Sequence, residues 1–283
     1  MNQILVPLNP RSDFENILDY AESVVHRSGA QLTVQYSAGA GAVRERSSQY
    51  QSEEPVAPFI EGIRNARARH QLKALCQRLF EKNIPFQIKV ANTYSSQAII
   101  READQGAYDL ILMGTQTRPG LLSSLRKAMA IKVIGSVKTP VFVVPNRNRF
   151  NEIQHITYAV DLSGYDPSII QQVKTIAALF DAKLTIAHVN AELKDQSRKE
   201  QYLNSLEKTI SDTLDYPKIY YRFFDDVDPL AGIKKLVNLN QSSILAMTNR
   251  KKMSYRLFSS DHSLTHRMTK ESSVPILAFR KSL

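Results

Sequence analysis

The sequence lacks several features that mark particular classes of protein. Its single cysteine, Cys76, excludes an internal disulfide, and the helical apolar pattern around it predicts a buried thiol. No apolar run approaches the roughly 20 residues that cross a bilayer, so we predict no membrane segment. The N-terminal residues have no basic region followed by a long apolar region, as a secretory signal would, and they read directly as a strand. We therefore expect a cytoplasmic protein.

The sequence also lacks a recognisable set of catalytic residues. It contains no P-loop and no Ser-His-Asp or Cys-His pattern. His262 and His266 have the spacing of a helical metal pair beside Asp261, but no third ligand stands at a suitable spacing. The acidic cluster before Pro229 is typical of a helix N-terminal cap. These patterns predict a protein that is not an enzyme and holds no metal.

Positive charge is the main bias of the composition. Lysine and arginine total 37 against 27 acidic residues, which gives a net charge of +10. Such a balance permits a nucleic-acid or anionic-membrane partner. The basic residues are dispersed, however, and the densest cluster, residues 64–73, fits a solvated helical face. Because no aromatic-interleaved RNA-binding signature accompanies the charge, nucleic acid is not an expected partner.

The 283 residues contain two copies of one pattern. Apolar runs that read as buried strands alternate with helical patterns, which predicts parallel, doubly wound sheets. Four strand segments of the first half return in the same order in the second half. The paired segments are 4–8 with 156–160, 30–36 with 182–188, 111–115 with 244–248, and 139–144 with 274–279. We predict two α/β domains, residues 1–146 and 152–283, each with a five-stranded, mostly parallel sheet.

One stretch, residues 108–145, organises the first copy. An apolar run at 110–113 predicts a buried strand, and a turn that contains Gly114 and Gly120 follows it. A helical pattern then leads to a second buried strand at Val141–Val144. Strand, glycine loop, helix and strand is the order in which an open α/β sheet builds a phosphate pocket.

These residues resemble the universal stress protein family in its tandem-domain form. The resemblance covers nearly the whole chain and rests on ILVPLN at 4–9, DLILMGTQTRPG at 109–120 and TPVFVVP at 139–145. It implies an adenine nucleotide alpha hydrolase-like fold for both halves. Family members that bind ATP carry Gly-x-x-Gly, nine residues, and then Gly followed by Ser or Thr. The glycines let backbone amides approach the phosphates, and the hydroxyl adds a donor.

The first copy keeps the turn of this motif and loses most of the phosphate cradle. The second glycine falls on Thr117, the distal glycine on Lys127, and the hydroxyl position on Ala128. Asn9 stands where the family usually has an aspartate. The candidate cofactor-binding residues of this copy, as the resemblance implies them, are Asn9, Gly114, Thr115, Thr117, Gly120 and Lys127.

The second copy departs further from the motif. Met247 replaces the first glycine, and two extra residues lengthen the segment that follows. The candidate residues here are Asp161, Thr248, Arg250 and Ser263. Two interpretations of the loop at 249–252 stay open. Its basic side chains replace lost backbone amides and hold an anion, or they belong to a solvated loop that binds nothing.

The resemblance implies a non-catalytic stress-response or regulatory protein with degenerate nucleotide pockets and no resident cofactor. The alternative is an adenine-nucleotide sensor in which one of the two loops still takes ATP. Single-domain relatives pair through their last strands, so the resemblance also implies that Val141–Val144 and Ile276–Phe279 join the two halves. It leaves a homodimer of the whole chain open.

Overall fold

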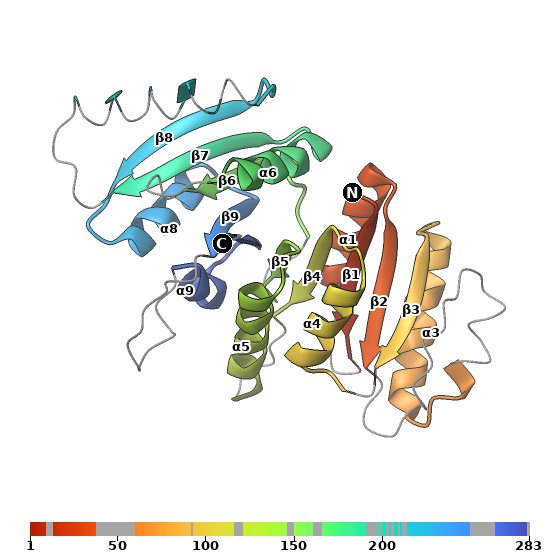
Figure 1. The fold of residues 1–283 in the computed structure, drawn as a ribbon. Helices are drawn as coiled ribbons and strands as arrows, with labels where there is room; N and C mark the ends of the chain where they lie inside the picture. The colour runs from red at the N-terminus through yellow and green to blue at the C-terminus, as the bar shows by residue number, and fades with distance from the viewer. Residues whose placement is uncertain are drawn as a thin grey trace. The chain divides into compact units, whose positions relative to one another are not determined.

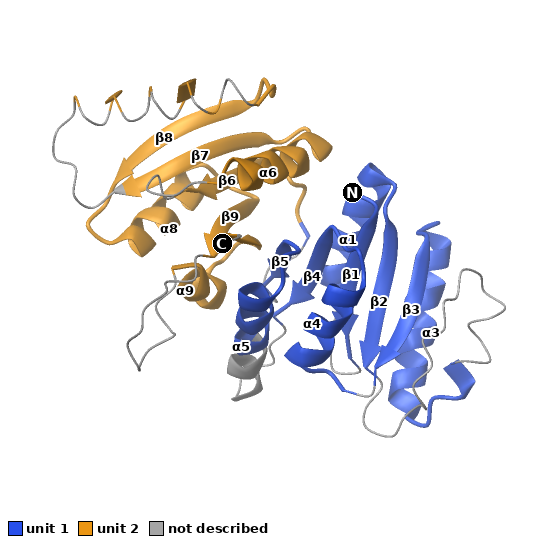
Figure 2. Cartoon of the chain, viewed as in Figure 1, with its two compact units in different colours: residues 1–150 blue, residues 151–283 orange. Residues whose placement is uncertain are grey.

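A computed structural model gives the fold of the protein (Figure 1). The structure describes residues 1–9, 14–37, 60–91, 93–115, 121–145, 150–160, 166–190, 214–249 and 264–281, with seven single positions between 197 and 210. The chain divides into two compact units, residues 1–150 and 151–283 (Figure 2). Each unit is described by itself below.

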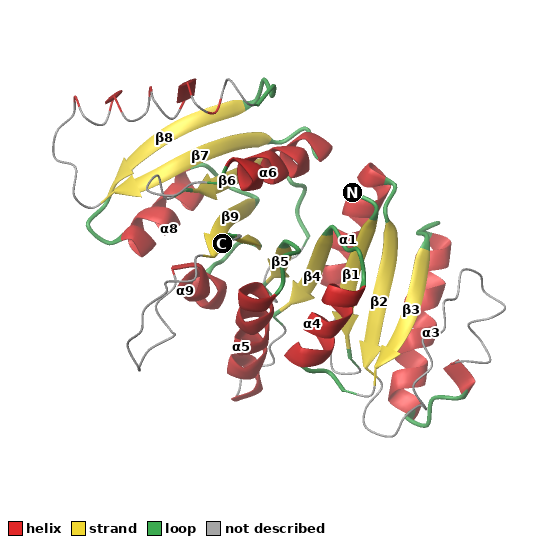
Figure 3. Cartoon of the chain, viewed as in Figure 1, coloured by secondary structure: helices red, strands yellow, loops and turns green. Residues whose placement is uncertain are grey.

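The first unit is a parallel sheet whose successive strands are connected by helices (Figure 3). Its strand order over the described residues is β3-β2-β1-β4-β5. The strands are β1 (Gln3–Leu8), β2 (Gln31–Ser37), β3 (Phe86–Ala91), β4 (Leu110–Gly114) and β5 (Val141–Val144). The helices are α1 (Glu15–Ser28), α3 (Ala66–Glu81), α4 (Ser96–Gln105) and α5 (Leu121–Ser136).

The central strand β1 shows why this chain forms a sheet that is covered on both faces. Ile4, Leu5, Val6 and Leu8 are all fully buried, although successive side chains point to opposite faces. A continuous apolar run is what a parallel sheet between two helix layers requires. The helix ends follow local rules as well, because Asn65 caps α3 and Gly29 ends α1 in the left-handed region at φ 69°.

The second unit repeats this topology. Its strand order over the described residues is β10-β9-β6-β7-β8, with all printed pairs parallel. The strands are β6 (His155–Ala159), β7 (Lys183–Asn190), β8 (Ile219–Asp225), β9 (Ile244–Asn249) and β10 (Ile276–Arg280). The helices are α6 (Pro167–Leu179), α8 (Pro229–Leu239) and α9 (Leu264–Glu271). The predicted fold class, two doubly wound and mostly parallel sheets, is confirmed.

Two local predictions, a helix cap and a buried thiol, are also confirmed. Asp228 caps α8 by accepting a hydrogen bond of 3.0 Å from the Leu230 amide. Cys76 is buried, and this burial raises the pKa of its thiol to about 12. No helix in the described part of the chain is both long and apolar enough to cross a membrane.

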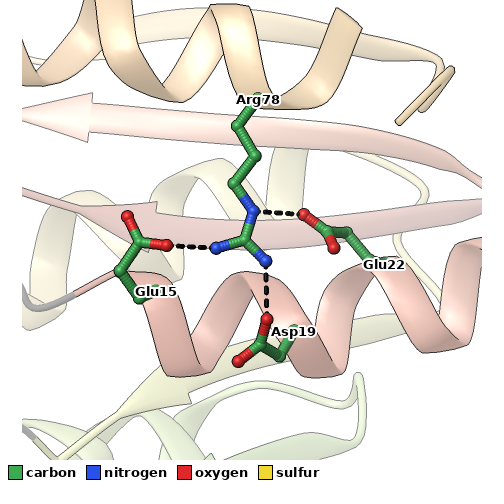
Figure 4. Close-up of polar contacts among 4 residues, drawn as sticks. All are labelled: Glu15, Asp19, Glu22 and Arg78. Carbon is green, nitrogen blue, oxygen red and sulfur yellow. Dashed lines mark hydrogen bonds and ion pairs between the residues drawn. The ribbon is translucent and has the colours of Figure 1, made fainter. Parts of the chain in front are cut away.

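An arginine with three carboxylate partners ties α1 to α3 (Figure 4). The Arg78 guanidinium of α3 contacts Glu15, Asp19 at 2.6 Å and Glu22 at 2.5 Å, all on α1. Burial alone would lower the pKa of Arg78, but hydrogen bonds to Glu22 and Asp19 raise it. The Glu22 side chain is only 11% exposed, so its carboxylate would be costly to leave without this cation.

We predict that Arg78→Gln lowers the free energy of unfolding by about 2 kcal/mol, because Glu22 would keep a partly buried charge without its cation. The matched control is Lys82→Gln, at the end of the same helix, where the side chain has no ion pair with a described residue. Denaturant unfolding of both variants measures the difference. Equal stability of the two variants would show that the ion-pair network contributes nothing.

Candidate functional site

The candidate site lies at the carboxyl edge of the first sheet. Chain order leads from β1 outward to β2 and β3 on one side, and then to β4 and β5 on the other. The order therefore reverses between β1 and β4, which pair directly through Ile4 with Leu110 and Leu5 with Ile111. Open α/β sheets bind ligands outside the carboxyl ends of their strands at such a switch point. Asn9 follows β1 and Gly114 ends β4, so the structure brings these two predicted residues to one edge.

Gly114 has a packing role at this edge. A Cβ atom at this position would lie 2.4 Å from Cδ1 and 2.9 Å from Cγ1 of Ile17. Ile17 is buried in the first turns of α1. The missing side chain thus allows α1 to approach the end of β4, and this close contact needs glycine whether or not a phosphate binds.

Thr115 is held by the neighbouring strand. Its amide donates to the Val144 carbonyl over 2.9 Å, and its hydroxyl lies 3.4 Å from the same oxygen. The residue is buried. Both polar groups of Thr115 therefore extend the pairing of β4 with β5, which joins Gly114 to Val144 in register.

The other predicted residues of the first copy are spread more widely. Asn9 is buried at the end of β1, and Lys127 is half-buried on α5. Thr117 and Gly120 lie outside the described residues. The structure consequently places three of the predicted residues on adjacent strand ends and a fourth on the following helix.

Polar groups that the sequence reasoning missed lie beside this edge, on β2. Gln35 is buried, donates to the Ala98 carbonyl of α4 over 3.1 Å, and leaves its Oε1 atom without a partner among the described residues. Ser37 donates to the Thr93 carbonyl over 3.0 Å. The alternation of Thr33, Gln35 and Ser37 in β2 could have revealed this face, because alternate residues of a strand share one side of the sheet.

The matching edge of the second unit is closed by side-chain hydrogen bonds. The Tyr158 hydroxyl and Thr248 Oγ1 lie 2.8 Å apart, and Thr265 Oγ1 donates to the Thr248 carbonyl over 3.2 Å. Met247, at the position of the first glycine, is buried. Tyr158 was missed, although the alignment of 156–160 with 4–8 places it where the first copy has Val6.

Three predicted residues of the second copy, Asp161, Arg250 and Ser263, lie outside the described residues. His262 and Asp261, considered as metal ligands from the sequence, also lie outside the described residues. His266, the other histidine of that pair, is on α9. Within the described residues, no group of three His, Cys, Asp or Glu side chains is placed to hold a metal ion.

The sequence matches the model of the universal stress protein family over residues 1–145. The chain belongs to this family, which confirms the resemblance drawn from its motifs. A comparison with curated proteins found no match.

Solved structures of universal stress proteins share the fold of the whole chain. A universal stress protein from Archaeoglobus fulgidus DSM 4304 superposes with a TM-score of 0.69 at 15% identity, and the match covers 99% of both chains. A putative universal stress protein from Pseudomonas aeruginosa UCBPP-PA14 gives a TM-score of 0.66 at 15% identity, over 99% of this chain and 93% of that one. A functionally unknown protein from Pseudomonas aeruginosa PAO1 gives 0.65 at 15% identity, over 99% and 92%.

We predict that Gly114→Ala lowers the free energy of unfolding by about 2 kcal/mol, because the new Cβ would overlap Ile17. Ile17→Val removes the nearest atom, Cδ1. The double variant should therefore be less destabilised than the sum of the two single variants, by about 1 kcal/mol.

A second glycine gives the matched control for this cycle. A Cβ at Gly29 would meet no atom within 4 Å, and its cost arises only from φ 69°. Gly29→Ala should add to Ile17→Val without coupling. Denaturant unfolding of all five variants measures both cycles, and strict additivity at Gly114 would refute the packing role.

Proposed function

We propose that this chain is a non-catalytic regulatory member of its family, whose two carboxyl edges serve structure in place of nucleotide binding. The proposal rests on one observation: the candidate residues at both edges already contact other residues of this chain. Gly114 accommodates Ile17, and Thr115 bonds to Val144. In the second unit, Thr248 bonds to Tyr158.

Physical chemistry explains why these bonds disfavour a phosphate. A phosphate cradle needs backbone amides and hydroxyls that are free to turn toward the ligand. The Thr115 amide already has an acceptor at 2.9 Å, and the hydroxyl of the half-buried Thr248 has a partner at 2.8 Å. A nucleotide would have to break these hydrogen bonds, or bind through other groups, and either route reduces its affinity.

Membership of the family supports the non-catalytic part of the proposal. Universal stress proteins are generally non-catalytic. The sequence contains no nucleophile with a matching base at a recognisable spacing. A regulatory protein of this kind would act through contacts with proteins or small ligands.

The alternative is an adenine-nucleotide sensor. Its support is the position of Asn9, Gly114 and Thr115 at the switch point, together with Lys127 on the helix that follows. In that case Lys127 would replace lost amides by charge, and Arg250 would do the same in the second copy. ATP is the ligand that this alternative names.

We predict that millimolar ATP, ADP or AMP leaves the melting temperature of the protein unchanged. A ligand that binds only the folded state at about 100 times its dissociation constant would add about 2.7 kcal/mol of stability. Differential scanning fluorimetry with a calorimetric titration makes the measurement. A saturable rise in melting temperature would favour the sensor, and its loss in Lys127→Gln or in Arg250→Gln would identify the copy responsible.

We also propose that β5 and β10 carry the contact between the two halves. Within its own unit, each strand ends the order of the sheet, and Val141–Val144 and Ile276–Phe279 are apolar throughout. An apolar edge strand with unpaired backbone groups is an aggregation hazard unless another element covers it. Pairing of the halves through these strands would remove the hazard in both.

Amide hydrogen exchange of the whole chain tests this pairing. We predict slow exchange for every amide of Val141–Val144, because those that do not bond to β4 would bond to the other half. The amides of the edge strand β3 that face away from β2 are the internal control and should exchange quickly. Rapid exchange of alternate amides in β5 would rule out the pairing.

A further inference from the structure

One face of the second sheet carries two cations and an aromatic ring away from the carboxyl edge. Register pairs Thr185 with Tyr220 and Ala187 with Arg222 across β7 and β8. Alternation along β7 places Lys183 on the same face as Thr185. We call Lys183, Tyr220 and Arg222 the β7–β8 patch.

The β7–β8 patch is open to solvent. Tyr220 is 49% exposed, although it is a large aromatic residue, and Lys183 and Arg222 are exposed as well. Helix α8 packs on this face at the other end of the strands, where Gly232 approaches Val189. Figure 1 shows α8 beside the arrowheads of β7 and β8. Near the starts of β7 and β8, Lys183 and Tyr220 remain exposed, whereas Thr185 beside them is buried.

In the first unit, the residues that correspond to the β7–β8 patch are covered by other side chains. Lys89 of β3 lies 2.6 Å from Glu102 of α4 and 3.3 Å from the Tyr108 hydroxyl. Its ammonium group also lies 5.8 Å from the centre of the Tyr108 ring. Gln87, two residues earlier, is buried and donates to Thr33. The cation of the first unit is thus neutralised and covered.

The duplication changes each of these groups in the second unit. Register makes Tyr220 the counterpart of Gln87, and Arg222 the counterpart of Lys89. Counting seven residues from the helix caps makes Lys235 the counterpart of Glu102. The repeat likewise places Gln241, which is exposed, at the position of Tyr108.

Among the residues that the structure describes, the cations of the patch have no carboxylate partner of the kind that Glu102 gives Lys89. Lys235 pairs with Asp226 at 2.7 Å. Neither Arg222 nor Lys183 forms an ion pair within the described part of the chain. The change from Glu102 to Lys235 therefore removes the carboxylate that neutralises the corresponding cation of the first unit.

His155, on the neighbouring strand β6, is affected by the positive charges of Lys183 and Arg222. Its ring nitrogens lie 2.7 Å from the Asn240 carbonyl and 2.7 Å from Thr185 Oγ1. Burial lowers the pKa of His155, the Asn240 carbonyl opposes this effect, and Lys183 and Arg222 lower the pKa further. The charged groups that act on His155 are thus both cations.

The sequence predicted no nucleic-acid partner, because Lys183 lies far along the chain from Tyr220 and Arg222, and only the register of β7 and β8 brings the three together. We propose that the β7–β8 patch binds single-stranded nucleic acid. Lys183 and Arg222 are four register positions apart, about 13 Å along the strands, and Tyr220 lies midway between them. An exposed ring with a cation on each side matches an unpaired base with its two flanking phosphates. A duplex fits poorly, because its bases are already stacked and cannot reach the ring. The net charge of +10 adds long-range attraction.

Fluorescence anisotropy with the full chain and labelled single strands of about 12 nucleotides tests the proposal. Oligouridine and oligodeoxythymidine distinguish RNA from DNA, and preference for either one supports the proposal. We expect binding at about 50 mM salt that weakens steeply toward 200 mM. Tyr220→Ala should weaken binding roughly tenfold, whereas Tyr220→Phe should retain it. Arg222→Gln should reduce the slope of affinity against salt by about one.

Matched controls distinguish binding at this patch from non-specific attraction to positive charge elsewhere on the protein. Arg67→Gln and Lys73→Gln alter exposed cations on α3 of the first unit and should leave binding unchanged. Melting curves confirm that each variant is folded, and Arg222→Gln serves if Tyr220→Ala is not. Three results would overturn the proposal: no binding at low salt, full binding by both Tyr220→Ala and Arg222→Gln, or equal competition by inorganic polyphosphate.

Discussion

Helix α1 is the element on which the arrangement of the first unit depends. It contacts three other elements through residues spaced along its length. Ile17 packs against Gly114 at the end of β4, and Tyr20 meets the Phe142 ring of β5 edge to face at 5.5 Å. Its acidic side bonds to Arg78 of α3. Because these contacts act together, the end of β4 is fixed by packing, and its glycine is needed even where no phosphate binds.

The internal duplication shows how one scaffold acquires two surfaces. Strand order and register are the same in both units, so corresponding positions can be compared directly. In the first unit, Glu102 neutralises Lys89 beneath Tyr108. In the second, the corresponding residues Lys235 and Gln241 leave Arg222 and Tyr220 facing solvent. At these matched positions the side chains differ, and a closed polar contact in one copy becomes an open cationic surface in the other.

The sequence predicted what depends on local patterns. Apolar runs and their repetition gave the two parallel sheets, the helical pattern around Cys76 gave its burial, and the aspartate before Pro229 gave the cap of α8. The partners of the site residues were not predictable in this way. Ile17 meets Gly114 across 97 residues of sequence, and Tyr158 meets Thr248 across 90. Such contacts follow from tertiary packing, which no short motif records.

We propose that both carboxyl edges keep the topology of a nucleotide site, while the Val144 carbonyl and the Tyr158 hydroxyl occupy polar groups of Thr115 and Thr248 there. Native mass spectrometry of the full chain, before and after incubation with ATP, tests this central claim most directly. The mass of the bare chain should dominate in both samples. One or two ATP molecules retained per chain, with the adduct lost in Lys127→Gln or Arg250→Gln, would contradict it.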